Sequence, residues 1–249
     1  MNKKVIYTAI FGDKDVLRDP EFLSDGFDFV CFTDNRKIKS GVWDVRYVQA
    51  PFHDPVRCAR YYKILAHRFL ADYEYSIWID GNMVIRKDPN GLVKEYLKNC
   101  SLAVYNHFNQ KRRIFGLFWV RDRRFARNCI YKEAMELIRR TEAGFYMDDV
   151  GKIRKQIERY KSENYPQENG LAVTMVLIRR HNDVSMKKLM EAWWEELKNN
   201  SRRDQLSFNY VAWKTKIPFC YIKGDPRHNS YFQRLKHKKR ENYNGIICS

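Results

Sequence analysis

The stretch Tyr75-Ser-Ile-Trp-Ile-Asp-Gly-Asn82 decides the fold that we expect for this chain. Its apolar run, residues 77–79, is typical of a buried strand and ends abruptly on Asp80. A carboxylate just after a buried strand lies at the strand's carboxyl end, where open α/β sheets bind ligands. Gly81 permits close approach of the backbone, and Asn82 offers a second oxygen to the same point. Such a pair suits a divalent cation on a diphosphate, and a simple tight turn would give the same pattern.

Further strands are expected on both sides of this stretch, at residues 5–11, 27–33, 43–48, 102–105 and 170–179. Helices are expected from Pro55, capped by Asp54, to about Leu70, and at residues 129–141, 152–161, 186–197 and 201–212. Residues 110–127, crowded with arginines and aromatics, receive no assignment. Alternating strands and helices predict an α/β fold: one domain over residues 1–249, with a mainly parallel central sheet flanked by helices.

The composition excludes general disorder, because 44% of the 249 residues are hydrophobic and 31% are charged. A formal net charge of +17 should attract polyanions such as nucleic acid, anionic lipid or phosphorylated small molecules. The six cysteines form no C-x-x-C pair, which argues against a zinc knuckle and favours free thiols in a reducing compartment.

The chain carries no recognisable targeting segment. Residues 1–4 lead directly into a strand-like segment too short for a signal peptide, and no apolar stretch approaches the ~20 residues that span a bilayer. These features predict a cytoplasmic protein. The basic tail from about Arg234 to Arg240 suits loose peripheral contact with an anionic membrane.

Three cations share one side of the helix that begins at Pro55. Arg57, Arg60 and Lys63 are spaced by three residues, so their charges could face a diphosphate held near Asp80. In a chain this basic, a solvated cationic face is the alternative.

A second candidate site lies where Ser201-Arg-Arg-Asp-Gln205 precedes a helix. Asp204 and Gln205 could stand at a helix start beside a reaction centre. They could equally belong to a capping box in which Ser201 and Asp204 satisfy each other's backbone amides. In residues 147–149, Asp148-Asp149 favours an N-cap over a ligand pair.

A late histidine, His228, lies in a turn-rich segment, and imidazole is a good ligand for manganese. A lone loop histidine is more often simply exposed to solvent. The sequence contains no P-loop, dinucleotide-binding, serine-hydrolase or zincin motif. It therefore gives no support to these four classes of protein.

The order of these motifs resembles the nucleotide-sugar glycosyltransferases of the GT-A fold, a Rossmann-like single domain. It is similar to the group with glycogenin and bacterial lipopolysaccharide galactosyltransferases: an Ala-Arg helix, an Asp-x-Asp strand end, an Asp-Gln helix start and a late histidine. Ala59-Arg60, Asp80-Gly-Asn82, Asp204-Gln205 and His228 match in that order. The whole chain resembles the glycosyltransferase-like domains of plant mucilage-related and bacterial capsule proteins, through residues 7–13, 32–34, 76–82 and 201–208.

The resemblance implies a role for each matched position. Uracil and ribose would lie against a set at two strand ends: Thr8, Ala9, Ile10, Phe11, Gly12, Thr33 and Asp34. Arg60 and Lys63 would neutralise the diphosphate, with Arg57 and Gly81 beside it. Asp80, Asn82 and His228 would hold Mn²⁺ or Mg²⁺, and Asp204 and Gln205 would line the pocket where donor sugar meets acceptor. Asn82 replaces the family's usual second acid, which should lower metal affinity.

The function that follows from the resemblance is transfer of a sugar from a UDP-sugar to a glycan or lipid-linked acceptor. The alternatives are a non-catalytic module that binds anions and a nucleotide-binding pseudoenzyme. Nucleic acid is not an expected partner, because no stacking-aromatic strand motif of RNA-binding domains is present.

Overall fold

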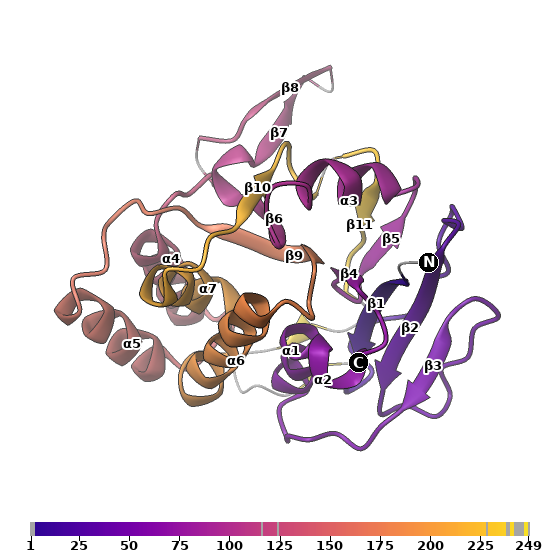
Figure 1. The fold of residues 1–249 in the computed structure, drawn as a ribbon. Helices are drawn as coiled ribbons and strands as arrows, with labels where there is room; N and C mark the ends of the chain where they lie inside the picture. The colour runs from indigo at the N-terminus through magenta and orange to yellow at the C-terminus, as the bar shows by residue number, and fades with distance from the viewer. Residues whose placement is uncertain are drawn as a thin grey trace.

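A seven-stranded sheet forms the centre of the protein, in the strand order β10-β6-β9-β4-β1-β2-β3 (Figure 1). The computed structural model describes residues 3–115, 117–123, 125–227 and 229–237, and the backbone of 240–241 and 247–248. The strands of the sheet are β1 (Lys4–Ile10), β2 (Phe27–Thr33), β3 (Asp44–Tyr47), β4 (Tyr75–Ile79), β6 (Leu102–Asn106), β9 (Ala172–Arg179) and β10 (Cys220–Ile222).

All strands of this sheet except β9 run in the same direction. β1 pairs in parallel with β2 and β4, β2 with β3, and β6 with β10. β9 is antiparallel to β4 on one side and to β6 on the other, so β6 and β10 run the same way as β4. The predicted α/β fold with a mainly parallel sheet is confirmed, and the carboxyl ends of six strands meet at one edge.

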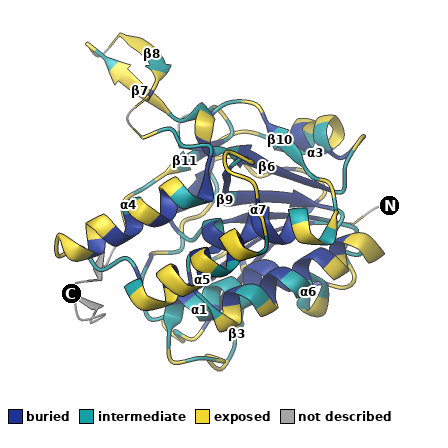
Figure 2. Cartoon of the chain, turned by 90° about the vertical axis from the view of Figure 1, so that its left-hand side faces the viewer, coloured by how far each residue is buried: buried dark blue, intermediate teal, exposed yellow. Residues whose placement is uncertain are grey.

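Two hydrophobic cores lie on opposite faces of the sheet because neighbouring strand residues point to opposite sides. In β1, Val5 and Tyr7 enter one core, and Ile6 and Ile10 enter the other. The first core is covered by α1 (Pro55–Ile64), α4 (Ile130–Glu142), α5 (Val150–Ser162), α6 (Val184–Asn199) and α7 (Asp204–Thr215). The second core lies under α3 (Asn90–Tyr96), β5 (Met83–Ile85) and β11 (Phe232–Arg234). Figure 2 shows the buried sheet between these layers.

The predicted helix from Pro55 to Leu70 is interrupted at Leu65, so α1 ends at Ile64 and α2 spans Ala66–Phe69. Leu65 has ψ 36°, outside the helical range, and is fully buried. Arg179 donates to the backbone carbonyls of Lys63 and Ile64, and the Tyr7 hydroxyl also donates to that of Lys63. These side chains take over carbonyls that a continuous helix would use, which explains the interruption.

The segment left unassigned at residues 110–127 contains a hairpin. A short turn of 3-10 helix, η1 (His107–Asn109), leads into β7 (Lys111–Ile114) and β8 (Phe118–Arg121), which pair only with each other. The hairpin projects from the body of the protein at the top of Figure 1. Near the end of the chain, β12 (Arg240–Glu241) pairs with β13 (Ile247–Cys248).

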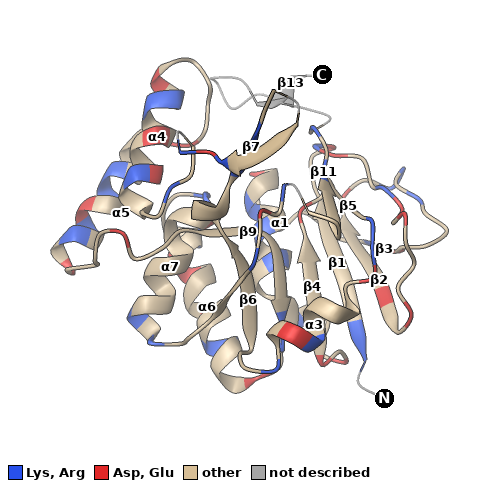
Figure 3. Ribbon diagram, turned by 90° about the horizontal axis from the view of Figure 1, so that it is seen from above, with Lys and Arg blue, Asp and Glu red and all other residues tan. Residues whose placement is uncertain are grey.

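The remaining expectations concern charge, thiols and membrane spans. Lys and Arg are spread over α4, α5 and α6 among acidic residues, so positive charge is not confined to one site (Figure 3). The five cysteines whose side chains are described are free thiols, as predicted. Within the described ranges, no helix is both long and apolar enough to cross a membrane.

Candidate functional site

The carboxyl edge of the sheet gathers the polar residues that were singled out from the sequence. Asp80 directly follows β4, and Gly12 and Asp34 lie just beyond the neighbouring strands β1 and β2. The backbone amide of Gly12 donates to both carboxylate oxygens of Asp34, at 3.2 and 3.3 Å. The ends of β1 and β2 are therefore tied together beside the end of β4.

Asp80 directs one carboxylate oxygen, Oδ1, toward a set of donors. Trp78 Nε1 donates to it at 2.9 Å, Lys63 Nζ lies 3.4 Å away, and Arg60 Nη1 lies 3.6 Å away. The backbone amide of Asp80 donates to Met175 of β9, which fixes the turn that follows. Among the described residues, every hydrogen bond and ion pair of this carboxylate falls on Oδ1, which leaves Oδ2 available for a ligand.

Asp204 lies far along the chain, yet it meets the same two cations. Its Oδ2 is 2.5 Å from Lys63 Nζ and 3.0 Å from Arg60 Nε, and it accepts a hydrogen bond from Thr174 Oγ1 at 2.8 Å. Asp204 and Lys63 are both buried. We name the four charged residues Arg60, Lys63, Asp80 and Asp204 the charge cluster. It joins α1, β4 and α7, three elements widely separated in sequence.

The contacts of Ser201 and Asp204 test the capping-box interpretation. Ser201 Oγ donates to Asp148 at 2.5 Å, and the residue before α7, Arg203, makes no side-chain cap. The carboxylate of Asp204 turns into the charge cluster instead of toward a backbone amide. Ser201 and Asp204 therefore form no capping box in the described structure, and the role of Asp204 in a functional site stays a prediction. Asp149 caps α5, as predicted.

The electrostatics of the cluster keep Asp204 ionised. Burial alone would raise the pKa of the Asp204 carboxyl, but the charges of Arg60 and Lys63 hold it well below its usual range. Beneath the cluster, Arg179 is fully buried, and its guanidinium donates to the backbone carbonyl of Lys63 and to the Tyr7 hydroxyl. Burial raises the pKa of Tyr7 to about 12, so this hydroxyl stays neutral.

A C-terminal segment brings an unforeseen histidine to the Asp80-Gly-Asn82 turn. β11 pairs antiparallel with β5, and the pairing continues as Asn82 exchanges two hydrogen bonds with Leu235, each of 2.8 Å. His237 follows, with Nε2 3.4 Å from Asn82 Nδ2 and Nδ1 2.8 Å from Asp15 Oδ1. The sequence predicts no site role for His237, which is one residue of the basic tail. The predicted histidine, His228, lies outside the described residues.

The residues around this turn fit a hard divalent cation. Among the described residues, no three histidine, cysteine or acidic side chains converge, so a metal site at this turn would need the amide oxygen of Asn82 as a ligand. That oxygen accepts no hydrogen bond within the described chain, because Asn82 uses its amide nitrogen toward Leu235. Asp15 at His237 Nδ1 directs Nε2 toward Asn82, whose amide nitrogen lies 3.4 Å from it, and a carboxylate on the other ring nitrogen is typical of metal-bound histidines. A mixed set of oxygen and imidazole nitrogen suits Mn²⁺ better than Mg²⁺.

The residues expected to hold uracil and ribose differ in how far they reach the surface. Ala9, Ile10 and Phe11 are buried in the two cores, as are Thr8 and Thr33 at neighbouring strand positions. Of this set, only the loop residues Gly12 and Asp34 are accessible to solvent. The buried members of the set therefore support the loops, and a ligand at this edge would contact Gly12 and Asp34 directly.

Gly81 is required by close packing. A Cβ at this position would lie 3.1 Å from Cγ1 of Ile10 and 3.4 Å from a carboxylate oxygen of Asp15. A side chain here would require Ile10, Asp15 or the turn that carries Asp80 and Asn82 to shift by a few tenths of an ångström. The glycine thus sets the position of the candidate ligands.

Two further predicted site residues have other contacts. Arg57 does not join Arg60 and Lys63: its guanidinium donates to the backbone carbonyls of Leu197 at 2.5 Å and Asn200 at 2.7 Å. It therefore caps the carboxyl end of α6, and the prediction that it shares their face is wrong. Gln205 donates to the carbonyl of Ala172 at the start of β9, which holds α7 against the sheet next to Asp204.

Comparison with known proteins assigns the chain to a family. The chain belongs to the TOD1/MUCI70 family, described as a glycosyltransferase-like domain, whose model matches residues 1–238. The resemblance noted from the sequence is thereby confirmed.

One relative is a protein of Arabidopsis thaliana named probable hexosyltransferase MUCI70, 25% identical over 272 residues. The match covers 96% of this chain and 43% of that protein, so the chain spans less than half of the relative's length. Among solved structures, the apo form of the bifunctional glycosyltransferase WbbM matches 91% of this chain and 39% of its own, at 10% identity and a TM-score of 0.49. Mouse xyloside xylosyltransferase 1, also apo, matches 89% of this chain and 85% of its own, at 8% identity and a TM-score of 0.47.

Proposed function

We propose that this protein is a metal-dependent glycosyltransferase that moves a sugar from a UDP-sugar to a hydroxyl of a glycan or lipid-linked acceptor. The observation that carries the proposal is the charge cluster at the carboxyl edge of the sheet, where Arg60 and Lys63 bridge Asp80 and Asp204. Family membership supports the reaction class, and the name of the plant relative supports a hexosyl donor.

The chemistry needs positive charge near the leaving group. Breaking the anomeric C–O bond places negative charge on the departing diphosphate, and fixed cations stabilise that charge best in a site that excludes water. Lys63 is fully buried and Arg60 is largely so, which makes their charges strong at short range. When bound, a divalent cation supplies Lewis-acid stabilisation of the same leaving group. Asp80, Asn82 and His237 are the residues that would hold Mn²⁺.

Asp204 and Gln205 are assigned to the pocket where the donor sugar meets the acceptor. The contacts of Asp204 with Lys63, Arg60 and Thr174 fix its carboxylate in one place. A carboxylate held in this way can hydrogen-bond a sugar hydroxyl and hold the acceptor in line with the anomeric carbon. Its depressed pKa rules out a role as general acid near neutral pH, because the group stays ionised.

Calorimetry with UDP and other nucleotides, in the presence and absence of Mn²⁺, tests the first half of the proposal. We expect UDP to bind more tightly with Mn²⁺, and the Asp80→Ala variant to lose that dependence. Asp44→Ala is the matched control, since Asp44 pairs with Arg46 on the surface. Equal UDP binding with and without Mn²⁺ would exclude metal dependence.

Hydrolysis of a panel of UDP-hexoses and UDP-pentoses tests the second half. One feature favours a second candidate, a nucleotide-binding pseudoenzyme: Asn82 stands where the related enzymes have a carboxylate. Tight UDP binding with no hydrolysis or transfer from any donor would favour that candidate, whereas turnover of one donor would exclude it.

A further inference from the structure

The β7–β8 hairpin carries a cluster of exposed apolar side chains that the charge cluster and the sheet do not explain. Phe115 is 91% exposed, Leu117 73% and Phe118 68%, and Trp119 next to them is 44% exposed. Elsewhere in the described chain, Phe145 and Val184 are exposed singly, and Phe22 and Leu23, 45% and 59% exposed, form a smaller pair. Scattered exposed residues are ordinary, but a contiguous group at the tip of a projecting hairpin marks an interaction surface.

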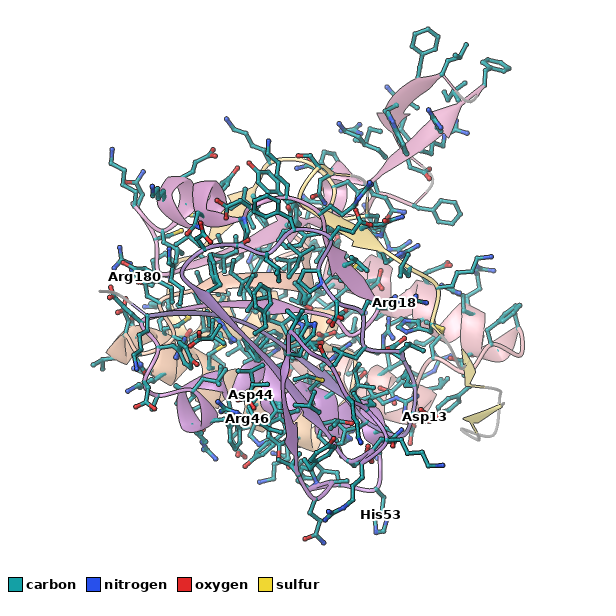
Figure 4. The ribbon with its side chains drawn as sticks, turned by 90° about the vertical axis from the view of Figure 1, so that its right-hand side faces the viewer. Asp13, Arg18, Asp44, Arg46, His53 and Arg180 are labelled. Atoms are coloured by element: carbon teal, nitrogen blue, oxygen red, sulfur yellow. The ribbon has the colours of Figure 1, made fainter. Side chains whose placement is uncertain are left out.

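Within the described ranges, the backbone of the hairpin is joined to the body of the protein at its base. Its two strands pair with each other from Lys111–Arg121 to Ile114–Phe118 and join no other sheet. At the base, the amide of Lys111 donates to Asp225 Oδ2, and the amide of Asp122 donates to the carbonyl of Gln110, both at 2.8 Å. The side chains of the hairpin stand clear of the body in Figure 4. The tip is therefore presented away from the rest of the protein.

The turn at the tip of the hairpin places a phenylalanine in an unusual backbone conformation. Phe115 has φ 49°, in the left-handed region that glycine and asparagine occupy at little cost and that bulky residues rarely adopt. A phenylalanine at this position gains nothing from burial, since its side chain is almost fully exposed. Strain at an exposed apolar residue is what a surface kept for contact with a partner would show.

The charges around the tip identify the partner by its chemistry. The exposed charged residues of the hairpin and its base are all cationic: Lys111, Arg112, Arg113, Arg121 and Arg123. The single acid between residues 107 and 127, Asp122, is buried. An apolar tip of Phe and Leu with Trp beside it, on a cationic stalk, matches the layers of an anionic bilayer, whose headgroups lie above the acyl chains. A single-stranded nucleic acid would favour aromatic rings spread along a groove, and Leu117 offers no stacking face.

We propose that the β7–β8 hairpin docks the protein on an anionic lipid surface, with Phe115, Leu117 and Phe118 inserted at the headgroup level and the arginines of the stalk on lipid phosphates. The hairpin follows the carboxyl end of β6, which runs parallel to β4, so it leaves the sheet at the edge that carries Asp80. Docking turns that edge toward the bilayer. It follows, resting on the proposed function, that the acceptor is lipid-linked.

Flotation with vesicles of phosphatidylcholine, alone or mixed with phosphatidylglycerol, tests the proposal on the 249-residue chain. We expect binding to the anionic vesicles only. Phe115→Ser with Phe118→Ser should weaken vesicle binding by at least about tenfold, because two aromatic rings are no longer transferred from water into the lipid. Arg112→Gln with Arg113→Gln should weaken it by about thirtyfold, since each cation near an anionic surface contributes about a factor of five.

Matched controls separate the hairpin from general effects. Met135→Ser with Phe145→Ser removes two residues of similar exposure, 61% and 63%, and Lys187→Gln with Lys188→Gln removes two exposed cations on α6. Both should bind like the wild type. Circular dichroism and unchanged donor hydrolysis would show that the tip variant is folded. If the wild type does not bind UDP, the proposed function fails while the vesicle result stands.

Three outcomes would overturn the docking proposal. The first is equal binding of the wild type to neutral and anionic vesicles, or to neither. The second is wild-type vesicle binding by the tip variant, with loss instead in Lys238→Gln with Lys239→Gln, which would transfer the role to the basic tail. The third is a tip variant that binds vesicles normally but loses a soluble glycan acceptor or an RNA oligomer.

Discussion

Replacing Asp204 by asparagine should destabilise the protein in a way that depends on pH. Asp204→Asn keeps the shape of the side chain and one of its oxygens, but it removes a charge that lies 2.5 Å from Lys63 Nζ and 3.0 Å from Arg60 Nε. Breaking a buried ion pair by removing one partner costs about 3–5 kcal/mol. In the variant, Lys63 and Arg60 would still be paired with Asp80, at 3.4 and 3.6 Å. We therefore expect a loss of stability at the lower end of this range, about 3 kcal/mol.

The pH dependence follows from the depressed pKa of Asp204. In the unfolded chain an aspartate titrates near about 3.9, so the stabilisation from this carboxylate is fully present above that value. It is lost as the pH falls through the lower pKa of the folded state, by about 1.4 kcal/mol for each pH unit below the unfolded value. The gap between wild type and Asp204→Asn should be constant from pH 7 to 5 and about 1 kcal/mol smaller at pH 3.

Urea unfolding at pH 7, 5 and 3 measures this gap, and thermal unfolding should show a fall in Tm of about 6–12 °C at pH 7. The control is Asp44→Asn, which removes a carboxylate 2.8 Å from Arg46 on the surface, where Figure 4 shows the two labels together. An exposed pair of this kind contributes less than about 1 kcal/mol. A gap below 1 kcal/mol at pH 7, or one that stays the same down to pH 3, would refute the role given to the charge of Asp204.

Three further predictions address the site. Asp80→Ala should lower donor turnover by at least about a hundredfold while the fold stays intact, and wild-type hydrolysis would remove Asp80 from the metal site. His237→Ala and Asp15→Asn should each raise the Mn²⁺ concentration for half-maximal activity by about 10- to 100-fold, and unchanged metal titrations would exclude both. Arg57→Gln should lower Tm and leave KM for the donor unchanged, because Arg57 binds the end of α6, whereas a raised KM would return Arg57 to the site.

Much of the fold was predictable because local pattern and tertiary structure agree. The apolar run at residues 77–79 forms β4, and Asp80 follows it at the edge of the sheet, as its position after a buried strand predicts. Pro55 and Asp54 likewise start α1 with the expected N-cap. In both places the sequence signal and the structural cause lie within a few residues of each other.

The features that were missed depend on contacts between distant residues. The interruption at Leu65 arises from Arg179, more than a hundred positions away, which takes the carbonyls of Lys63 and Ile64. His237 reaches Asn82 only because β11 pairs with β5. The signal that could have found it was a histidine within a run otherwise made of Lys and Arg, where charge alone would not select an imidazole.

The charge balance around Lys63 suggests how the site tolerates buried cations before a donor arrives. Arg60, Lys63 and Arg179 carry three positive charges, whereas Asp80 and Asp204 carry two negative ones, so one positive charge remains uncompensated. The two carboxylates offset most of the desolvation penalty of Arg60 and Lys63. Without these partners, the buried cations would destabilise the fold. Under the proposed function, the remaining charge would attract a diphosphate to this edge. Because the cations are already held in place, a diphosphate would meet a preorganised field, and it is this preorganisation that stabilises a leaving group as its charge develops.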